Sequence, residues 1–106
     1  MLLTEKKCRP CSAGTPPLTR EQAKDLAKDT PDWYIADDMI WREFKFEDFQ
    51  QAMGFVEEIA DLAEDEGHHP NIHICYNRVK LECTTHKIGG LSENDFILAA
   101  KIDKLG

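Results

Sequence analysis

All four histidines of this chain lie in one stretch near its middle. His68, His69 and His73 follow one another closely, and His86 comes shortly after them. Imidazole has an ordinary pKa of about 6.5, so it can both give and accept a proton near neutral pH. A lone surface histidine commonly has no chemical role, and we assign His73 to that class. The other three, with the flexible pair Gly89-Gly90 beside them, predict acid–base chemistry.

Two other chemistries are possible for such a group of histidines. Imidazole is a common zinc ligand, and Cys8-Arg9-Pro10-Cys11 adds a CxxC pattern. Adjacent histidines in an extended segment point in opposite directions, however, and neither a second cysteine pair nor an HExxH motif is present. The Gly-x-Ser-x-Gly motif that is typical of nucleophilic catalysis by serine is also absent. We therefore predict no metal, and a dehydratase in which one imidazole protonates a leaving hydroxyl while another removes a proton elsewhere.

Composition limits the class of protein. The chain has 106 residues, enough for one domain, with 42% apolar and 31% charged residues. A formal net charge of −7 disfavours binding to nucleic acid and to anionic membranes. No apolar run approaches the roughly 20 residues of a membrane span, and no secretory signal precedes the domain, so we expect a cytoplasmic protein with free thiols.

The elements that must position the histidines follow from the apolar periodicity. Residues 1–17 predict an N-terminal arm with little regular structure, and residues 18–106 predict a single domain. The expected elements are a helix over 20–29 capped by Thr19 and Gln22, strands over 33–35 and 39–46, a helix over 48–66 ended by Gly67, a hairpin around Asn77-Arg78, and a helix from Glu93 to about Lys104. This order, α-β-β-α-β-β-α, predicts an α+β fold in which three helices pack on one face of a four-stranded antiparallel sheet.

Two packing patterns can be predicted within these elements. Six residues at helical spacing should turn the long helix toward the core: Phe49, Met53, Val56, Ile59, Ala60 and Ala63. In the second hairpin, a turn at Asn77-Arg78 would pair Tyr76 with Val79, Ile74 with Leu81 and Ile72 with Cys83 on one buried face. The same register places His73 opposite Glu82 on the other face, as an ordinary cross-strand pair.

The predicted hairpin also brings the histidines together. His68 and His69 follow the long helix, and His86 follows the strand that returns toward the start of the hairpin. Extending the register places Pro70 near Thr85. We therefore expect His69 and His86 to converge at one end of the sheet.

Several segments of the chain resemble the pterin-4a-carbinolamine dehydratase family, from about Thr19 to the C-terminus. These segments are Trp33, Phe44-Lys45-Phe46-Glu47-Asp48-Phe49, Gly54-Phe55, His68-His69-Pro70, Tyr76-Asn77-Arg78-Val79, Thr85-His86 and Gly90-Leu91-Ser92-Glu93-Asn94-Asp95. The resemblance implies dehydration of a 4a-hydroxytetrahydropterin, left by an aromatic amino acid hydroxylase, to the quinonoid dihydropterin. It implies no metal and no cofactor.

The resemblance also implies roles for particular residues. His68, His69 and His86 would move protons between the 4a-hydroxyl, the ring N5 and solvent. The substrate-binding residues would be Trp33, Glu64, Gly67, Pro70, Thr84, Thr85, Lys87 and Asp95, with Trp33 as a wall of the pocket and with Glu64 and Asp95 as acids near the histidines. Asp95 also stands where the capping box of the last helix wants a carboxylate, so a structural role is an alternative for it.

The chain departs from the family at two of these positions, and two other functions stay open. Gly67 stands where the family often has an acid, and Lys87 where it often has Glu; both differences could change pterin affinity. One alternative is a non-catalytic protein-binding module, since a mammalian member of the family is also a dimerisation partner of a homeodomain transcription factor. The other is a dehydratase for a different pterin, such as one in molybdenum-cofactor metabolism. Because family members self-associate through their helices, a homodimer or homotetramer is expected.

Overall fold

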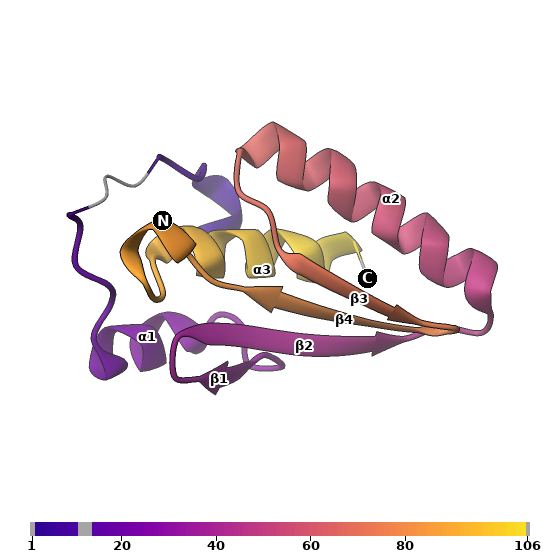
Figure 1. Ribbon diagram of the computed structural model, residues 1–106, viewed down its shortest axis with the longest axis horizontal. Coiled ribbons are helices and arrows are strands. Elements are labelled where there is room, and N and C mark those ends of the chain that lie inside the picture. Colours follow the sequence, from indigo (N-terminus) through magenta and orange to yellow (C-terminus); the bar gives the residue numbers. More distant parts are fainter. Residues whose placement is uncertain (1, 11–13, 106) are drawn as a thin grey trace.

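The predicted order of helices and strands is confirmed by the computed structural model, which describes residues 2–10 and 14–105. The elements are η1 (Leu3–Glu5), α1 (Arg20–Ala27), β1 (Tyr34–Ala36), β2 (Met39–Lys45), α2 (Phe49–Glu66), β3 (Asn71–Cys75), β4 (Arg78–Cys83), η2 (His86–Ile88) and α3 (Glu93–Leu105). The four strands form one antiparallel sheet in the order β1-β2-β4-β3. The fold is therefore α+β, with the helices against one face of the sheet (Figure 1).

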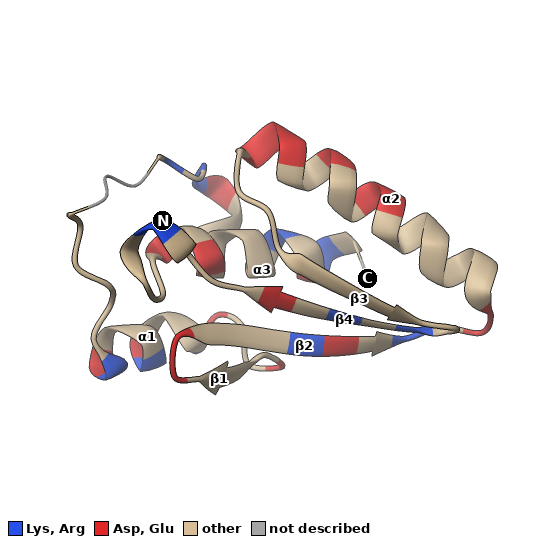
Figure 2. Ribbon diagram, in the orientation of Figure 1, with Lys and Arg blue, Asp and Glu red and all other residues tan. Residues whose placement is uncertain are grey.

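The core lies between this face of the sheet and the helices α2 and α3. Alternate residues of β2 and β4 point into it, as expected for strands with one buried face. The sheet contributes Ile40, Phe44, Val79, Leu81 and Cys83, and the helices contribute Phe55, Ile59, Phe96, Ile97 and Ile102, all of them buried. Apart from the buried Glu66, the acidic residues of α2 are exposed and lie along its outer side (Figure 2), which leaves its inner side mostly apolar.

Helix α1 begins as predicted and ends earlier. Thr19 and Gln22 form the expected capping box, in which each side chain bonds the backbone of the other residue. The helix ends at Ala27 rather than at residue 29, and Thr30 donates its backbone N–H to the carbonyl of Ala27 at 3.0 Å. The turn thus starts before Pro31, because the residue that precedes a proline avoids helical angles.

The prediction of which side of α2 faces the core is only partly correct. Its buried residues are Ala52, Phe55, Ile59, Ala63 and Glu66. Of the six predicted positions, Ile59 and Ala63 are buried, Met53 and Val56 are half-buried, and Phe49 and Ala60 are exposed. Phe55 determines which side of α2 faces the core. The centroid of its ring lies 4.8 Å from that of Phe44 and 5.0 Å from that of Phe46. The apolar arc of α2 is wider than the core can cover, so part of it faces solvent.

The predicted register of the second hairpin is wrong by two residues. Ile74 pairs with Val79 and Ile72 with Leu81, and the two-residue turn is Tyr76-Asn77. Tyr76 adopts a left-handed φ of 52°, and it is 64% exposed rather than buried. The cause lies just after β2, because Asn77 exchanges hydrogen bonds with the backbone of Phe46 and so must occupy the turn. A shift of two residues keeps the alternation of faces along both strands, although Ile74 is 41% exposed rather than buried.

The N-terminal arm is in contact with the domain. Leu3 and Cys8 are buried in the hydrophobic core, and the short helix η1 packs against α3. Lys6 also forms an ion pair with Glu93 at the start of α3, at 2.7 Å. Residues 2–10 of the arm thus pack on the domain rather than projecting from it (Figure 1).

Candidate active site

A pocket of about 440 Å³ lies where α2, β4, η2 and the N-terminal arm meet. Its lining contains all three histidines that the sequence singled out, from two separate segments of the chain. The lining residues are Arg9, Pro10, Glu66, Gly67, His68, His69, Thr84, Thr85, His86, Lys87 and Asn94. The expected convergence of His69 with His86 is therefore a feature of the structure.

Gly67 directs the chain from α2 into the pocket. It caps the helix with a left-handed φ of 68°, and its N–H donates to the carbonyl of Ala63 at 2.9 Å. This conformation suits glycine, because a side chain would be strained there. Glycine at position 67, the first departure from the family pattern, is therefore suited to this helix cap. His68 follows directly and turns inward.

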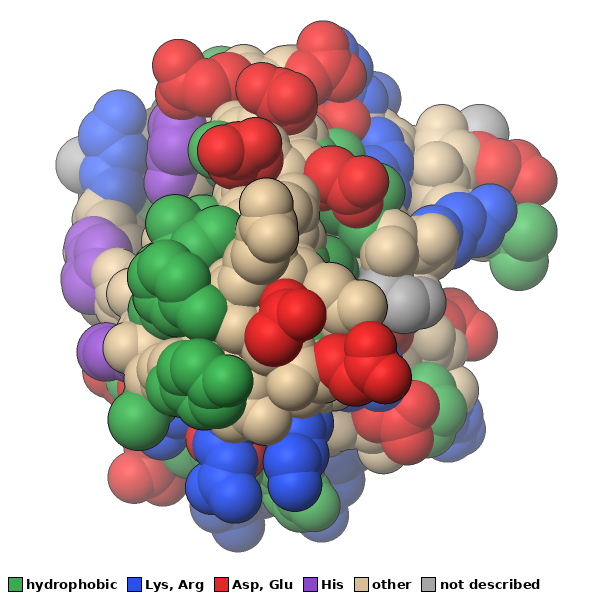
Figure 3. Space-filling view, turned by 90° about the vertical axis from the view of Figure 1, so that its right-hand side faces the viewer, with side chains coloured by type: hydrophobic (Ala, Val, Ile, Leu, Met, Phe, Trp, Pro, Cys, Tyr) green, Lys and Arg blue, Asp and Glu red, His purple; other side chains and the backbone are tan. Residues whose placement is uncertain are grey.

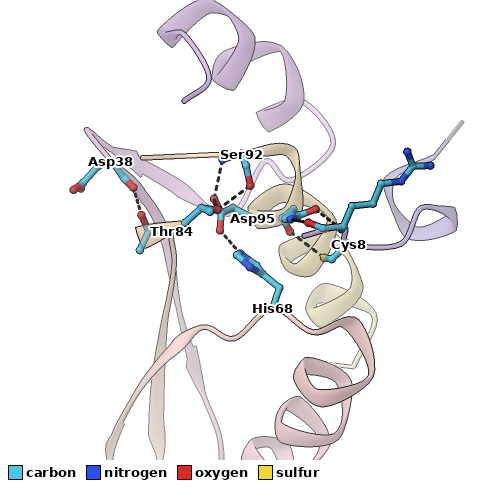
Figure 4. A network of polar contacts seen from close by, with 9 residues as sticks. Cys8, Asp38, His68, Thr84, Ser92 and Asp95 are labelled. Carbon is cyan, nitrogen blue, oxygen red and sulfur yellow. Dashed lines mark hydrogen bonds and ion pairs between the residues drawn. The ribbon is translucent and has the colours of Figure 1, made fainter. Parts of the chain in front are cut away.

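His68 is held by a buried network at the start of α3 (Figure 4). Its Nε2 lies 2.6 Å from Oδ1 of Asp95, a carboxyl group with no exposed surface. The other oxygen of Asp95 accepts hydrogen bonds from the Thr85 hydroxyl and from the Ser92 N–H, each at 2.9 Å. The Thr85 and Ser92 hydroxyls also bond each other at 2.8 Å. Asp95 thus acts as a helix cap through one oxygen and orients an imidazole through the other.

The other histidines differ from His68 in exposure and in partners. His69 pairs through Nε2 with Glu64 at 2.5 Å, and both side chains are largely exposed. Among the described residues His86 forms no ion pair, and its exposed side chain stands at the start of η2. His73 lies outside the pocket and bonds Glu82 at 3.0 Å. His73 lies directly opposite Lys80 in the strand register, and its side chain reaches Glu82 diagonally. The predicted side-chain contact with Glu82 is therefore correct, but the predicted position opposite Glu82 is wrong.

The remaining residues named from the sequence fall into three groups. Gly67, Thr84, Thr85 and Lys87 line the pocket, and Thr84 also donates to the carbonyl of Asp38 at 2.5 Å. Glu64, Pro70 and Asp95 are outside the lining but adjoin it, the two acids through their histidine partners. Trp33 is buried elsewhere, with its indole N–H bonded to Asp103 at 2.8 Å. In this single chain Trp33 is therefore part of the core rather than of the pocket lining.

Four lining residues were not identified from the sequence: Arg9, Pro10, Glu66 and Asn94. Glu66 did carry a signal, because it continues the buried stripe of α2 after Ile59 and Ala63, where a carboxylate is unusual. Arg9 and Pro10 carried none, since nothing in an irregular arm indicates what it packs against.

The cysteines and carboxylates add no metal site to this picture. Within residues 2–10 and 14–105, no group of three or more His, Cys, Asp or Glu side chains is arranged to hold a metal ion. Cys8, Cys75 and Cys83 are free thiols, as expected, while Cys11 lies outside the described residues. Burial raises the pKa of Cys8 to about 12, with a further contribution from the nearby Glu66 carboxylate. No helix in the described part of the chain is long and apolar enough to cross a membrane.

Comparison with known proteins identifies the family. The family model for pterin 4 alpha carbinolamine dehydratase matches residues 16–105. A protein of Nitrosomonas eutropha with the provisional name pterin-4-alpha-carbinolamine dehydratase is 48% identical over 104 residues, which are 97% of this chain and 92% of the relative. A relative of the same provisional name from Halorhodospira halophila is 47% identical over 108 residues, covering 100% of this chain and 99% of its own. The chain belongs to the pterin-4a-carbinolamine dehydratase family, a family of hydro-lyases.

Two solved structures resemble this fold. A transcriptional coactivator/pterin dehydratase from Brucella melitensis has a TM-score of 0.79 and 33% identity, with 84% of this chain and 97% of the other covered. A pterin dehydratase-like protein, described as a RuBisCO assembly factor in the alpha-carboxysome, has a TM-score of 0.58 and 27% identity over 69% of this chain and 84% of its own. The fold thus serves proteins described both as dehydratases and as assembly partners.

Proposed function

We propose that this protein dehydrates a 4a-hydroxytetrahydropterin to the quinonoid dihydropterin by acid–base catalysis with histidines. The observation that carries the proposal is that His68, His69 and His86 line one pocket, with a carboxylate bonded to each of the first two. Membership of the family supplies the substrate class. The product is one that a reductase could return to the tetrahydropterin used by an aromatic amino acid hydroxylase, which is the functional link we propose.

The reaction requires two proton transfers on one ring system. The bond between C4a and its hydroxyl oxygen breaks, and one imidazolium gives that oxygen a proton so that water leaves. The N5–H proton passes to a second, neutral imidazole, and the N–H electron pair forms the C4a–N5 double bond. General acid and base groups of this kind contribute about 10²- to 10⁴-fold each. The hydrogen bonds from Nε2 of His68 and His69 to carboxylates leave Nδ1 of each ring as its other proton-transfer site.

The direct test supplies chemically generated 4a-hydroxytetrahydropterin and follows its dehydration by absorbance. We expect the wild-type protein, purified without an affinity tag and analysed for metal content, to accelerate the reaction at least about 100-fold over buffer, the lower end of the range for one acid–base group. Equal rates with and without protein would contradict the proposed function. Stoichiometric zinc in an active preparation would replace the metal-free mechanism with a metal-assisted one.

The rival function is a protein-binding module with the same fold. The descriptions of the two structural neighbours, a coactivator and an assembly factor, favour keeping it as an alternative. A binding module needs its surface but not its imidazoles. Loss of turnover in single histidine variants that remain folded would therefore distinguish catalysis from binding alone. A dehydratase that prefers another pterin would instead be active only with that pterin.

We further propose that the protein is a homodimer or homotetramer. Phe49 of α2 is 50% exposed, and Ile74 and Tyr76 of the neighbouring hairpin are 41% and 64% exposed. The face that carries the hairpin tip and the start of α2 has a cluster of hydrophobic side chains, visible in Figure 3. Clusters of this kind mark contacts between proteins. Light scattering should give the mass of two or four chains, and the Phe49→Glu variant should shift toward one chain; a monomeric wild type would contradict the proposal.

A further inference from the structure

The segment Cys8–Pro10 is fixed in a position that makes it part of the histidine pocket. Arg9 and Pro10 line the same cavity as His68 and His86, although they are far from both in sequence. Cys8 is hydrogen-bonded to Glu66 of α2, the residue before Gly67. Arg9 is hydrogen-bonded to Asn94 of α3, the residue before Asp95. These are the two places that hold the His68–Asp95 pair, and Figure 4 shows Cys8 beside that network.

The first attachment is Asn94. Its Oδ1 accepts the Arg9 N–H at 3.0 Å, and its Nδ2 donates to the Arg9 carbonyl at 2.5 Å. Both backbone polar groups of Arg9 are thereby satisfied by one side chain, much as a neighbouring strand would satisfy them. The Cys8 thiol also contacts the carbonyl of Asn94 at 3.5 Å. Because Asn94 is itself buried at the start of α3, the segment cannot shift without breaking this pair.

The second attachment is Glu66, the last residue of α2. Its Oε1 accepts the Cys8 N–H at 2.9 Å, and its Oε2 accepts from Lys101 of α3 at 2.7 Å. Burial alone would raise the pKa of Glu66, but the hydrogen bonds from Lys101 and Cys8 and the charge of Lys101 outweigh it and lower the pKa. Glu66 is therefore a carboxylate at neutral pH, and it joins the segment, α2 and α3 in one buried contact.

These attachments determine what the segment offers to a ligand. The Arg9 amide and carbonyl are already used, and Pro10 has no N–H to donate. Arg9 is the polar side chain of the segment, whereas the Pro10 ring is apolar, and an apolar surface is suited to the face of a flat ring rather than to its polar edge. Resting on the proposed function, we propose that Pro10 packs against the bound pterin ring, and that Asn94 and Glu66 are positioning residues that hold Pro10 there.

The test compares the steady-state kinetics of Asn94→Ala and Pro10→Ala with those of Asn77→Ala. Asn77 is a matched control, because its Nδ2 also bonds a backbone carbonyl, that of Phe46 at 2.9 Å, in the hairpin remote from the pocket lining. We expect KM to rise about fivefold to tenfold in the first two variants with kcat within about twofold, since binding is lost but the histidines are kept. Asn77→Ala should have the wild-type KM.

Hydrogen exchange provides a readout that does not depend on turnover. The amides of Cys8 and Arg9 should exchange slowly in the wild-type protein, and a stable 7,8-dihydropterin should slow them further. Wild-type KM values in Asn94→Ala and Pro10→Ala, with arm amides indifferent to the pterin, would overturn this inference and leave the proposed function intact. Absence of dehydration by the wild type would overturn the proposed function instead, and slowing of the arm amides by the pterin would then still support the contact.

Discussion

Replacement of His69 or His86 by alanine should lower kcat/KM for the 4a-hydroxytetrahydropterin about 10²- to 10⁴-fold, the usual contribution of one acid or base. The effect should fall on kcat, because these imidazoles act on protons that move in the transition state. Both side chains are exposed, so the free energy of unfolding should change by no more than about 0.5 kcal/mol. Stopped-flow absorbance and urea denaturation measure the two effects separately.

His73→Ala is the control for His69→Ala. Both imidazoles are 58% exposed, and each bonds a glutamate through Nε2, at 3.0 Å in His73 and 2.5 Å in His69. They differ in place, because only His69 lines the pocket. Turnover in His73→Ala should equal that of the wild type. Equal losses in the two variants, or full activity in both, would show that the pocket does not carry the chemistry.

The fold was predictable from the sequence wherever an element carries its own signals. The capping box of Thr19 and Gln22 and the left-handed cap at Gly67 are local, so both helix boundaries could be placed. The turn of the second hairpin could not be predicted from the sequence, because turns at Tyr76-Asn77 and at Asn77-Arg78 give the same alternation of faces. What decides between them is a contact of Asn77 with Phe46, which follows a strand distant in sequence.

The same distinction explains what was found of the site. His68, His69 and His86 could be grouped because a hairpin joins their two segments, and even a two-residue error in register keeps them at one end. Pro10 could not be added, since its place depends on side-chain bonds from Glu66 and Asn94 to the backbone of an irregular arm. Such bonds have no sequence periodicity. Trp33 was named from the family resemblance alone; it is buried in the core, and its indole N–H bonds the half-buried Asp103.

Asp95→Ala should be the most destabilising single change at the site. Asp95 has no exposed surface, and its removal leaves the Ser92 N–H and the His68 ring without their partner, while the Thr85 hydroxyl keeps only Ser92. Each buried polar group that loses its partner costs about 1–3 kcal/mol. We expect a loss of about 3–5 kcal/mol in the free energy of unfolding, measured from urea midpoints at constant m-value.

A comparison with Asp48 separates the two roles of Asp95. Asp48 only caps α2, by accepting the Gln51 N–H at 2.8 Å, so Asp48→Ala should cost about 1 kcal/mol and leave turnover unchanged. Asp95→Asn keeps an oxygen for Ser92 and Thr85 but turns an NH₂ group toward His68. The imidazole must then accept at Nε2 and carry its only proton on Nδ1, so it can neither take up a proton at Nδ1 as a base nor become the imidazolium that an acid requires. Turnover in Asp95→Asn should therefore fall at least about tenfold while stability falls by only about 1 kcal/mol. Wild-type turnover in Asp95→Asn would reduce Asp95 to a helix cap.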